Sequence, residues 1–339
     1  MSIVLSGGGT GGHLAIVRAV KEELKNSGIE LVYIGSTKGQ DKAWFENDSD
    51  FDAVYFLESK GVVNQKGLGK LKSLWMMLKS MQKAKQIFKS HDTKVVLSVG
   101  GFSAAPSAFG AITSRIPLVI HEQNAALGTL NKILKPYAHT FISSYDSSSP
   151  ISSYPIKDIY FQSARCRDEI KTIIFLGGSQ GAVAINNLAL ELAPTLKEKG
   201  IKIIHQAGER NIQKVQEEYN RLGIEADVFG FSDKLAEYIA DADFAVARAG
   251  ASTLWELSAN GLPALYIPYP YAASDHQYHN AKFLVVQNLA WLIRESELDS
   301  SKVLEVLDQD ISEISAKLID SVNPNGAKEI AKLLISLHK

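Results

Sequence analysis

The stretch IVLSGGGTGGHLAIVRAVKEEL, residues 3–24, is an apolar run followed by a glycine-rich turn and an amphipathic segment. The last part places Leu14, Val17, Val20 and Leu24 three or four residues apart, as in a helix with one buried face. A strand, a tight glycine turn and a helix in this order are typical of a parallel sheet covered by helices. The stretch therefore predicts a doubly wound α/β unit.

The same pattern returns in the second half, as TIIFLGGSQGAVAINNLALELA at residues 172–193, where Ile185, Leu188 and Leu192 form the apolar face. Further segments then follow in matching order in both halves: LVYIG with KIIHQAG, DAVYFL with ADVFGF, KVVLSVGG with DFAVARAG, and IPLVIHEQN with LPALYIPYP. We therefore expect two tandem, doubly wound, Rossmann-like domains that face a cleft.

The boundary between the domains is expected near Ile156. The preceding segment SSYDSSSPISSYPI, residues 143–156, is rich in serine and proline and has little periodicity, as in a linker. This gives domains at 1–156 and 157–323. A last helix, at about Gly326–His338, has no counterpart in the repeat, and we expect residues 324–339 to pack back on the first domain.

Bulk composition narrows the function classes. The chain has 339 residues, of which 45% are hydrophobic and 22% charged, and its net charge is −1, so electrostatic capture of nucleic acid is not expected. The single cysteine, Cys166, fits a reducing compartment. The sequence has neither a secretory signal pattern nor an apolar run long enough for a membrane span. A cytoplasmic protein, or one attached to a membrane only at its surface, is expected.

Three glycine-rich turns are candidates for phosphate binding. Gly7–Gly12, Gly177–Gly181 and the weaker Val99–Ser103 each let backbone N–H groups approach an anion, and the first two lead into predicted helices. The alternative for any one of them is a tight turn without a ligand. No P-loop lysine follows, and no acidic residue is placed to hold an NAD ribose, so nucleotide hydrolysis and dinucleotide redox chemistry are disfavoured.

Two polar stretches follow strands at the expected ligand-binding edge. His121-Glu122-Gln123-Asn124 either binds something or forms a hydrogen-bonded loop cluster. In the second half, Glu256 either accepts the hydroxyls of a ribose or completes a capping box with Thr253.

A third polar stretch is Asp275–Asn280. Its amides and histidines suit sugar hydroxyls and phosphate oxygens. Its His–x–x–His spacing lacks the further ligands of a zinc site, so metal binding is discounted.

Residues 61–90 contain no acidic residue, and seven lysines recur among leucine, methionine, tryptophan and phenylalanine. A wide apolar face with one sign of charge suits an anionic membrane surface. The alternative is a core-facing surface helix with solvated lysines. The residues expected to contact the membrane are Leu71, Lys72, Leu74, Trp75, Leu78 and Lys79.

These motifs together resemble the MurG family, bacterial transferases that move N-acetylglucosamine from UDP-N-acetylglucosamine to undecaprenyl-pyrophosphoryl-N-acetylmuramoyl-pentapeptide (lipid I). The matching motifs are GGTGGH at 8–13, GGF-S at 100–103, HEQN-x3-G-x2-NK at 121–132, GGSQGA at 177–182, R-x-GA-x-T-x2-E at 248–256, GLPAL at 261–265 and DHQ-x2-NA at 275–281. The resemblance spans the chain. It implies a GT-B fold, an inverting transfer that gives lipid II, no cofactor or metal, and peripheral attachment to the cytoplasmic face of the inner membrane.

The resemblance assigns the second domain to the nucleotide sugar. It implies that Glu256 holds the ribose hydroxyls, that Asn124 reaches the N-acetylglucosamine, and that the backbone near Phe231 and Ser232 reads the uracil edge. The residues implied for the donor are Thr10, Gly11, Gly12, Asn124, Lys157, Ser179, Gln180, Ser232, Glu256, Gln277 and Asn280. The helix that Gly177–Gly181 precedes supplies positive potential for the leaving diphosphate.

The first domain is assigned to lipid I by the same resemblance. The residues implied for the acceptor are Gly8, Gly9, His13, Gly100, Gly101 and Ser103. The acceptor hydroxyl needs a base, for which His13 is the first choice and Glu122 the second. His13 could equally serve only as a hydrogen-bond donor to the acceptor phosphate. Contacts with other cell-wall enzymes are a further expectation.

The sequence departs from the family pattern in two places. Lys157 stands where relatives usually carry an arginine, which keeps the charge but loses the bidentate fork. Leu14-Ala15-Ile16 replaces the proline-containing segment that usually follows GGTGGH. Three alternatives remain: a glycosyltransferase for another lipid, a UDP-N-acetylglucosamine 2-epimerase, and a catalytically silent nucleotide-sugar-binding protein.

Overall fold

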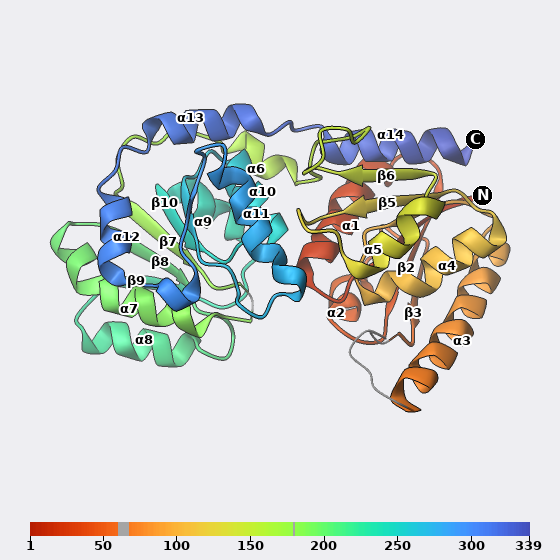
Figure 1. Ribbon diagram of the computed structural model, residues 1–339, viewed down its shortest axis with the longest axis horizontal. Helices are drawn as coiled ribbons and strands as arrows, with labels where there is room; N and C mark the ends of the chain where they lie inside the picture. Colours follow the sequence, from red (N-terminus) through yellow and green to blue (C-terminus); the bar gives the residue numbers. More distant parts are fainter. Residues whose placement is uncertain (60–67, 179) are drawn as a thin grey trace. The chain divides into compact units, whose positions relative to one another are not determined.

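The computed structural model describes residues 1–59, 68–178 and 180–339, apart from the side chains of residues 68–72. The chain forms two compact units, one of residues 1–156 with 325–339 and one of residues 157–324. Each unit holds a six-stranded sheet with helices on both faces (Figure 1). The tandem α/β fold expected from the repeat is confirmed.

The sheet of the first unit is parallel throughout and has the order β3-β2-β1-β4-β5-β6. Its strands are β1 (Ser2–Ser6), β2 (Glu30–Ser36), β3 (Ala53–Leu57), β4 (Thr93–Ser98), β5 (Leu118–Glu122) and β6 (Thr140–Ser143). The first five were predicted from the sequence; β6 was not, and it directly precedes the predicted linker 143–156, with which it shares only Ser143.

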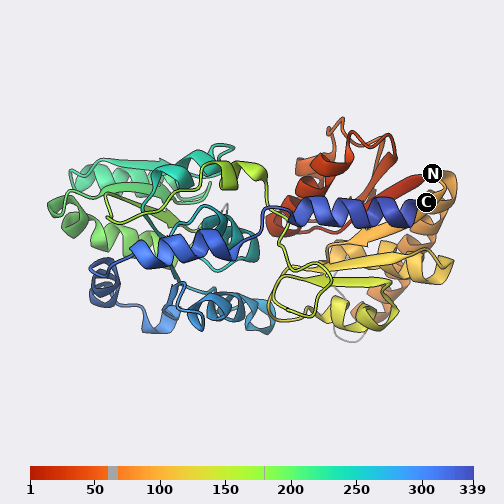
Figure 2. The ribbon, with the colours of Figure 1, turned by 90° about the horizontal axis from the view of Figure 1, so that it is seen from above.

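Helices cover both faces of this sheet. They are α1 (Gly11–Leu24), α2 (Asp41–Phe45), α3 (Leu68–Ser90), α4 (Ala105–Ser114), α5 (Thr129–Leu134) and α14 (Gly326–His338), with 3₁₀ turns η1 (Phe102–Ala104) and η2 (Lys135–Tyr137). One core joins Val4 and Ile120 of the sheet to Phe88 of α3 and Ala108 of α4. Because strand side chains alternate, the neighbours of Val4 point to the other face, where α1 and α14 pack on β1 (Figure 2).

The second unit repeats this plan with the strand order β12-β11-β10-β7-β8-β9. Its strands are β7 (Thr172–Leu176), β8 (Lys202–Gln206), β9 (Ala226–Phe229), β10 (Phe244–Ala247), β11 (Ala264–Tyr266) and β12 (Trp291–Leu292). Paired by position in the repeat, β7 to β12 lie in the same order as β1 to β6. The sequence analysis missed β12 because two residues are too few to show a period.

Two groups of helices cover the second sheet. They are α6 (Asp158–Gln162), α7 (Val183–Glu198), α8 (Ile212–Arg221), α9 (Leu235–Asp241), α10 (Ala251–Ala259), α11 (His276–Val285), α12 (Ser300–Leu307) and α13 (Ser312–Ser321), with 3₁₀ turns η3 (Ala273–Asp275) and η4 (Glu295–Glu297). The core on one face joins Phe175 of β7 to Leu188 of α7, Tyr219 of α8 and Val303 of α12. No helix in the described ranges is both long enough and apolar enough to cross a bilayer.

Candidate active site

The first glycine-rich turn connects β1 to α1 in a conformation that requires glycine. Gly7, Gly8 and Gly9 have φ angles of 132°, 156° and 88°. A Cβ at Gly9 would lie 2.5 Å from the ring of Phe102, and a Cβ at Gly8 would lie 2.5 Å from Asp41 Oδ1. The turn therefore has no room for side chains, and its backbone leads directly into the amino end of α1.

A buried carboxylate holds this turn from behind. Asp41, in the first turn of α2, accepts the Gly9 N–H at 2.7 Å and the Ser36 N–H at 2.9 Å. The Tyr33 hydroxyl, also buried, donates to the Gly7 carbonyl oxygen at 2.9 Å. The sequence analysis missed Asp41, because nothing in the DKAWF segment reveals a contact with a loop thirty residues earlier.

The turn after β4 lies against the first glycine turn. Gly100 and Gly101 have φ angles of 87° and 76°, and the Gly8 N–H donates to the Gly100 carbonyl oxygen at 3.4 Å. A Cβ at Gly101 would collide with the Gly8 carbonyl oxygen, and Ser103 is buried in η1 just beyond. The structure thus brings together the glycines predicted to bind the acceptor.

His13 lies in the first turn of α1 between two polar groups. Its Nδ1 is 2.9 Å from the Thr10 hydroxyl, and the Gln123 amide nitrogen lies 3.0 Å from its Nε2 and 3.3 Å from its Nδ1. Two polar side chains therefore hold the ring, and its imidazole is the candidate base.

Glu122, the second choice for the base, has both carboxylate oxygens hydrogen-bonded to the segment that follows it. Its Oε1 accepts the Asn124 N–H at 3.0 Å, and its Oε2 accepts the Gly128 N–H and the Asn131 amide, each at 2.9 Å. The side chain is also buried. These bonds favour the hydrogen-bonded loop cluster over a base, and we drop Glu122 as a catalytic candidate. Asn124 follows it on the same loop.

His121, the first residue of this polar stretch, is fully buried and stacks edge-on against Tyr154, with ring centroids 5.5 Å apart. Burial lowers its pKa to about 3, and repulsion from His13 contributes less. His121 is therefore neutral near pH 7 and lies beneath the site as an uncharged ring.

The described part of α3 has buried apolar residues near its carboxyl end and exposed apolar residues towards its amino end. Ala84, Ile87 and Phe88 are buried near its carboxyl end, as the alternative of a core-facing helix predicted. Further towards its amino end, Leu74, Trp75 and Leu78 are 43%, 64% and 45% exposed. Lys79 is exposed beside them, with its Nζ 5.6 Å from the Trp75 ring centroid.

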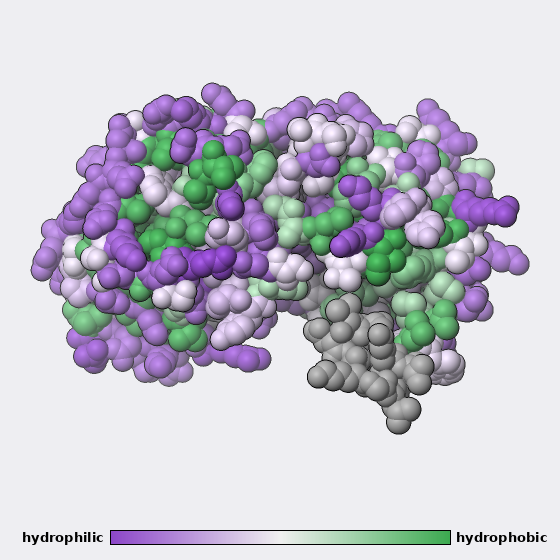
Figure 3. Space-filling model, viewed as in Figure 1, coloured by the Kyte–Doolittle hydropathy of each residue, from purple (hydrophilic) through white to green (hydrophobic). Residues whose placement is uncertain are grey.

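We call Leu74, Trp75, Leu78 and Lys79 the α3 patch. Figure 3 shows apolar surface at the lower right of the view, where Figure 1 draws α3. The predicted contacts Leu71 and Lys72 lie in α3, but their side chains are outside the described residues.

In the second unit, the turn after β7 is also held by a side chain from the neighbouring strand. The Gln206 side-chain oxygen accepts the Gly178 N–H at 3.1 Å. Gly181, with φ 76°, packs against the backbone of Gly208 two residues before α7 begins. Gln180 is exposed in this turn, and the predicted diphosphate contact Ser179 lies outside the described residues.

Glu256 lies in the middle of α10, and the capping alternative is wrong. Helix α10 begins at Ala251 with Gly250 as its N-cap, so Thr253 is already inside the helix and Glu256 is beyond its first turn. The Tyr160 hydroxyl donates to the Glu256 carboxylate, and Lys157 lies near enough to favour the charged form. Burial outweighs both and raises the pKa of Glu256 to about 7.

Two predicted amides on α11 already have partners. Gln277 accepts the Tyr269 N–H at 2.9 Å through its side-chain oxygen. Asn280 is fully buried, and its amide donates to the Ala249 carbonyl oxygen at 3.1 Å, just before α10. Because Asn280 is buried, we interpret it as a support for the turn that precedes α10, and not as a residue in direct contact with a ligand.

The turn after β9 was predicted to read uracil. The Phe231 N–H donates to Glu209 Oε1 at 2.6 Å, whereas the Ser232 hydroxyl accepts the Lys234 N–H at 3.1 Å. Reading of uracil by the Ser232 backbone stays a prediction. Within the described ranges, no three histidine, cysteine or acidic side chains are grouped as a metal site.

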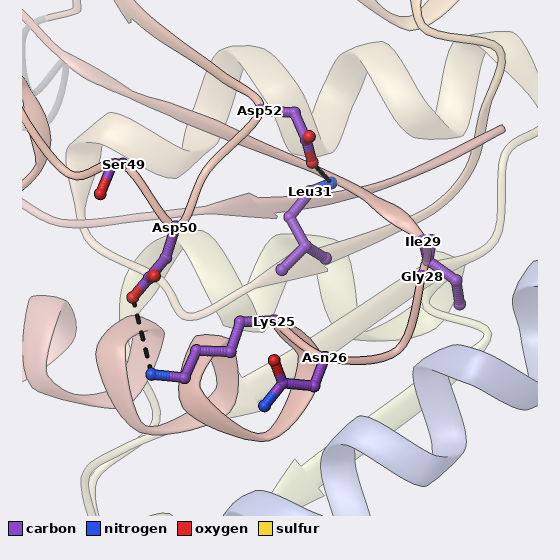
Figure 4. Close-up of a pocket in the computed structure, with 8 residues that line it drawn as sticks. All are labelled: Lys25, Asn26, Gly28, Ile29, Leu31, Ser49, Asp50 and Asp52. Atoms are coloured by element: carbon purple, nitrogen blue, oxygen red, sulfur yellow. Dashed lines mark hydrogen bonds and ion pairs between the residues drawn. The ribbon is translucent and has the colours of Figure 1, made fainter.

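A surface hollow of about 580 Å³ lies at the other edge of the first sheet. Figure 4 shows it bordered by the Lys25–Asp50 ion pair, at 3.8 Å, and by Asp52, which accepts the Leu31 N–H at 2.8 Å. Lys25 follows the carboxyl end of α1, and Leu31 lies near the amino end of β2. The hollow is therefore remote from the glycine turns and is not part of the candidate site.

Comparison with known proteins gives matches along the whole chain. Residues 3–143 match the glycosyltransferase family 28 N-terminal domain, and residues 172–334 match the glycosyltransferase family 28 C-terminal domain. The UDP-N-acetylglucosamine--N-acetylmuramyl-(pentapeptide) pyrophosphoryl-undecaprenol N-acetylglucosamine transferase of Sulfurovum sp. (strain NBC37-1) is 63% identical over 98% of both chains. The transferase of the same name from Sulfurimonas denitrificans is 52% identical over the full length of both.

Solved structures agree in fold. The crystal structure of Acinetobacter baumannii MurG covers 99% of both chains at 25% identity, with a TM-score of 0.80. The Streptomyces sp. SF2575 glycosyltransferase SsfS6, complexed with thymidine diphosphate, covers 99% of both at 14% identity, with a TM-score of 0.68, and shows likeness of fold alone.

Proposed function

The chain belongs to glycosyltransferase family 28 and, within it, to the MurG family of N-acetylglucosamine transferases, and from this premise we propose how its residues perform the transfer. The reaction moves N-acetylglucosamine from UDP-N-acetylglucosamine to the C4 hydroxyl of the N-acetylmuramoyl unit of lipid I. The product is lipid II. The observation that carries this assignment is the 63% identity to a transferase of that name over 98% of both chains.

We place the donor on the second unit. The partly buried Glu256 carboxylate accepts hydrogen bonds from the two ribose hydroxyls, and it is held ready for them by Tyr160 and Lys157. The diphosphate lies at the turn of Gly177–Gly181, where Gln180 is exposed. The amino end of α7 follows this turn and stabilises the charge that develops on the departing UDP.

We place the acceptor pyrophosphate on the first unit, at the contacting turns of Gly7–Gly12 and Gly100–Ser103. The N–H groups of Gly8 and Gly9 are bonded to the Gly100 carbonyl oxygen and to Asp41, so these two glycines shape the turn, and the proposed phosphate contacts come from Gly101, Ser103 and His13. His13 lies in the first turn of α1, directly after the glycine turn. This arrangement puts a base next to the bound acceptor.

The proposed chemical step is a single in-line displacement. The acceptor C4 oxygen attacks the anomeric carbon, the bond from that carbon to the phosphate oxygen breaks, and UDP departs with the electron pair. The His13 imidazole accepts the proton of the attacking hydroxyl. Attack from the face opposite the leaving group inverts the anomeric centre and gives a β1→4 disaccharide.

We further propose that the protein works at the cytoplasmic face of the inner membrane, as a peripheral protein. The acceptor carries an undecaprenyl chain that stays in the bilayer, so the enzyme must reach the surface. The α3 patch supplies three exposed apolar side chains and a lysine for this contact.

The decisive experiment measures transfer of labelled N-acetylglucosamine from UDP to a lipid I analogue, with a reaction without acceptor as the control. The expected product is an acceptor-dependent β1→4 disaccharide. Conversion of the donor to its 2-epimer without transfer would overturn the acceptor half of the proposal. Binding of UDP without either reaction would reduce the chain to a nucleotide-sugar-binding protein.

A further inference from the structure

Tyr160 contacts Glu256 from an element that the sequence analysis did not connect with the site. It lies on α6, at the beginning of the second unit, and is 6% exposed. Its hydroxyl donates to the Glu256 carboxylate. Its own carbonyl oxygen accepts the Asn260 amide at 3.0 Å. Because Glu256 and Asn260 are one turn apart around α10, Tyr160 is fixed to that helix at both ends.

Asn260 is itself held by a buried cation. Arg167 is 1% exposed, and its guanidinium donates to the Asn260 side-chain oxygen at 2.5 Å and to the Asn260 carbonyl oxygen at 2.6 Å. The Asn260 amide also donates to the Ser163 hydroxyl at 2.9 Å. A chain of buried hydrogen bonds therefore runs from Arg167 through Asn260 and Tyr160 to Glu256. Such a fully bonded network allows few alternative positions for its last member.

A ribose ligand requires a defined orientation of the Glu256 carboxylate. A carboxylate binds two neighbouring hydroxyls well only if both oxygens face them, and an exposed glutamate loses rotamer entropy on adopting that orientation. The Tyr160 hydroxyl has a single hydrogen, which it gives to the carboxylate, and so fixes the carboxylate before the ligand arrives. Lys157 and Tyr160 are the charged and titratable groups that act on Glu256, and both come from the α6 side.

We propose that Tyr160 is a positioning residue that orients Glu256 for the ribose hydroxyls of the donor. The proposal rests on the proposed function, in which Glu256 binds the ribose. It assigns part of the donor specificity to a hydroxyl that touches no ligand atom. It also explains why α6, a helix of only five residues, is tied so firmly to α10.

The test uses Tyr160→Phe, which removes the hydroxyl and keeps the ring. Tyr219→Phe is the matched control, because Tyr219 is also buried in the same unit and its hydroxyl bonds His205 Nδ1, at 2.9 Å, away from the site. Isothermal titration gives the Kd for UDP and for 2′-deoxy-UDP with each full-length variant. The ratio of the two values isolates ribose recognition from any general loss of folded protein.

We expect Tyr160→Phe to weaken UDP binding about fivefold to tenfold, in line with the loss of one ordinary hydrogen bond. The preference for UDP over 2′-deoxy-UDP should shrink, whereas Tyr219→Phe should keep the wild-type preference. An unchanged preference in Tyr160→Phe would overturn the proposal. Glu256→Gln distinguishes failure of the proposed donor site from failure of the proposed role of Tyr160. If Glu256→Gln binds UDP normally, the proposed donor site is wrong. If Glu256→Gln loses binding and Tyr160→Phe does not, only the role of Tyr160 is wrong.

Discussion

Glu122 ends strand β5 and Glu256 lies in the middle of α10, and their surroundings give these two carboxylates different tasks. Glu122 receives the N–H groups of Asn124 and Gly128 and the side-chain amide of Asn131 on α5, which leaves it to hold that segment in place. Glu256 receives a phenol hydroxyl and the field of a lysine, and burial keeps its pKa near 7. The second carboxylate therefore retains capacity for a ligand, and its ionisation falls in the physiological range.

The raised pKa of Glu256 predicts pH-dependent donor binding. A ribose needs the ionised carboxylate, so UDP affinity should be constant above about pH 8 and should fall up to about tenfold per pH unit well below pH 7. The folding stability of the free protein changes with pH in the opposite sense. The raised pKa of Glu256 contributes stability that is fully present below the ordinary pKa of 4.5 and is lost as the pH rises through about 7. Titration calorimetry across this range measures the first effect. Glu256→Gln should bind UDP weakly, and any pH dependence that persists in it belongs to the phosphate.

The proposed role of His13 as the base predicts that its removal lowers turnover and leaves donor binding unchanged. Replacing it with alanine removes the base and should lower kcat by about 10²–10⁴-fold, while the Kd for UDP stays at the wild-type value because Glu256 is untouched. His91→Ala is the control, since that imidazole bonds Tyr55 and Glu30 in the same unit, away from the glycine turns. Turnover of His13→Ala within about twofold of wild type would remove it as the base.

The sequence could single out candidates that belong to short motifs, such as His13 and Glu256, and their roles stay predictions. It could not predict Asp41 or Tyr160, because each acts through one contact with a residue far along the chain. The hydrogen-bond partners of Glu122 were also beyond reach, since the same HEQN letters fit a base and a loop anchor equally well.

The two glycine turns differ in backbone conformation and in the side chain that holds each of them. A carboxylate, Asp41, accepts the N–H of Gly9 in the first unit, and a neutral amide, Gln206, accepts that of Gly178 in the second. A turn that must present N–H groups to an anion needs an anchor behind it, because glycine alone leaves it conformationally free. The anchors come from the β2–α2 region and from β8, which hold equivalent places in the repeat.

Removal of the Asp41 carboxylate should weaken binding of the acceptor and leave binding of the donor unchanged. Asp41→Ala leaves buried N–H groups unpaired, and we expect a stability loss of about 1–3 kcal/mol together with a raised KM for the lipid I analogue. The Kd for UDP should not change, because the proposed donor site is on the other unit. Glu46→Ala, at the C-cap of the same helix and ion-paired with Lys42, should leave both quantities unchanged. An unaltered KM for the acceptor in Asp41→Ala would show that the turn keeps its shape without the anchor.

The α3 patch predicts membrane binding with separable apolar and charged parts. Trp75→Ser should reduce sedimentation with both neutral and anionic vesicles, and Lys79→Glu should reduce it mainly with anionic ones. Turnover of a water-soluble lipid I analogue should stay normal in both variants. Lys214→Glu, an exposed lysine on α8 of the second unit, controls for net charge. Unchanged vesicle binding in both patch variants would leave α3 as a surface helix with no membrane role.

At the scale of the whole molecule, the internal repeat predicted the fold. Segments at matching positions in the two halves became strands at matching positions in two sheets of the same order. The repeat could not supply β6 and β12, the sixth strands, because they are short and depend on their neighbour for their place. The core positions Leu14, Val17 and Ile185 followed from helical periodicity and are buried.

The C-terminal helix α14 predicts which unit a given core mutation weakens. Ile330 is fully buried in α14, so Ile330→Ala should destabilise the first unit by about 2–5 kcal/mol. UDP should raise only the transition of the second unit, by mass action. Differential scanning calorimetry with and without UDP assigns the transitions, and Leu318→Ala, in α13 of the second unit, should lower the UDP-sensitive one. A lowered UDP-sensitive transition in Ile330→Ala would contradict the assignment.

The return of α14 to the first unit also sets an order of events on the ribosome. Residues 1–156 leave the exit tunnel first, but the helix that packs on α1 and β1 is translated only after the whole second unit. The first unit therefore remains with one face of its sheet incompletely covered until α14 is made. The second unit can fold as soon as its own residues have left the tunnel. A message cut short before codon 326 would yield a complete second unit joined to a first unit that lacks its last helix.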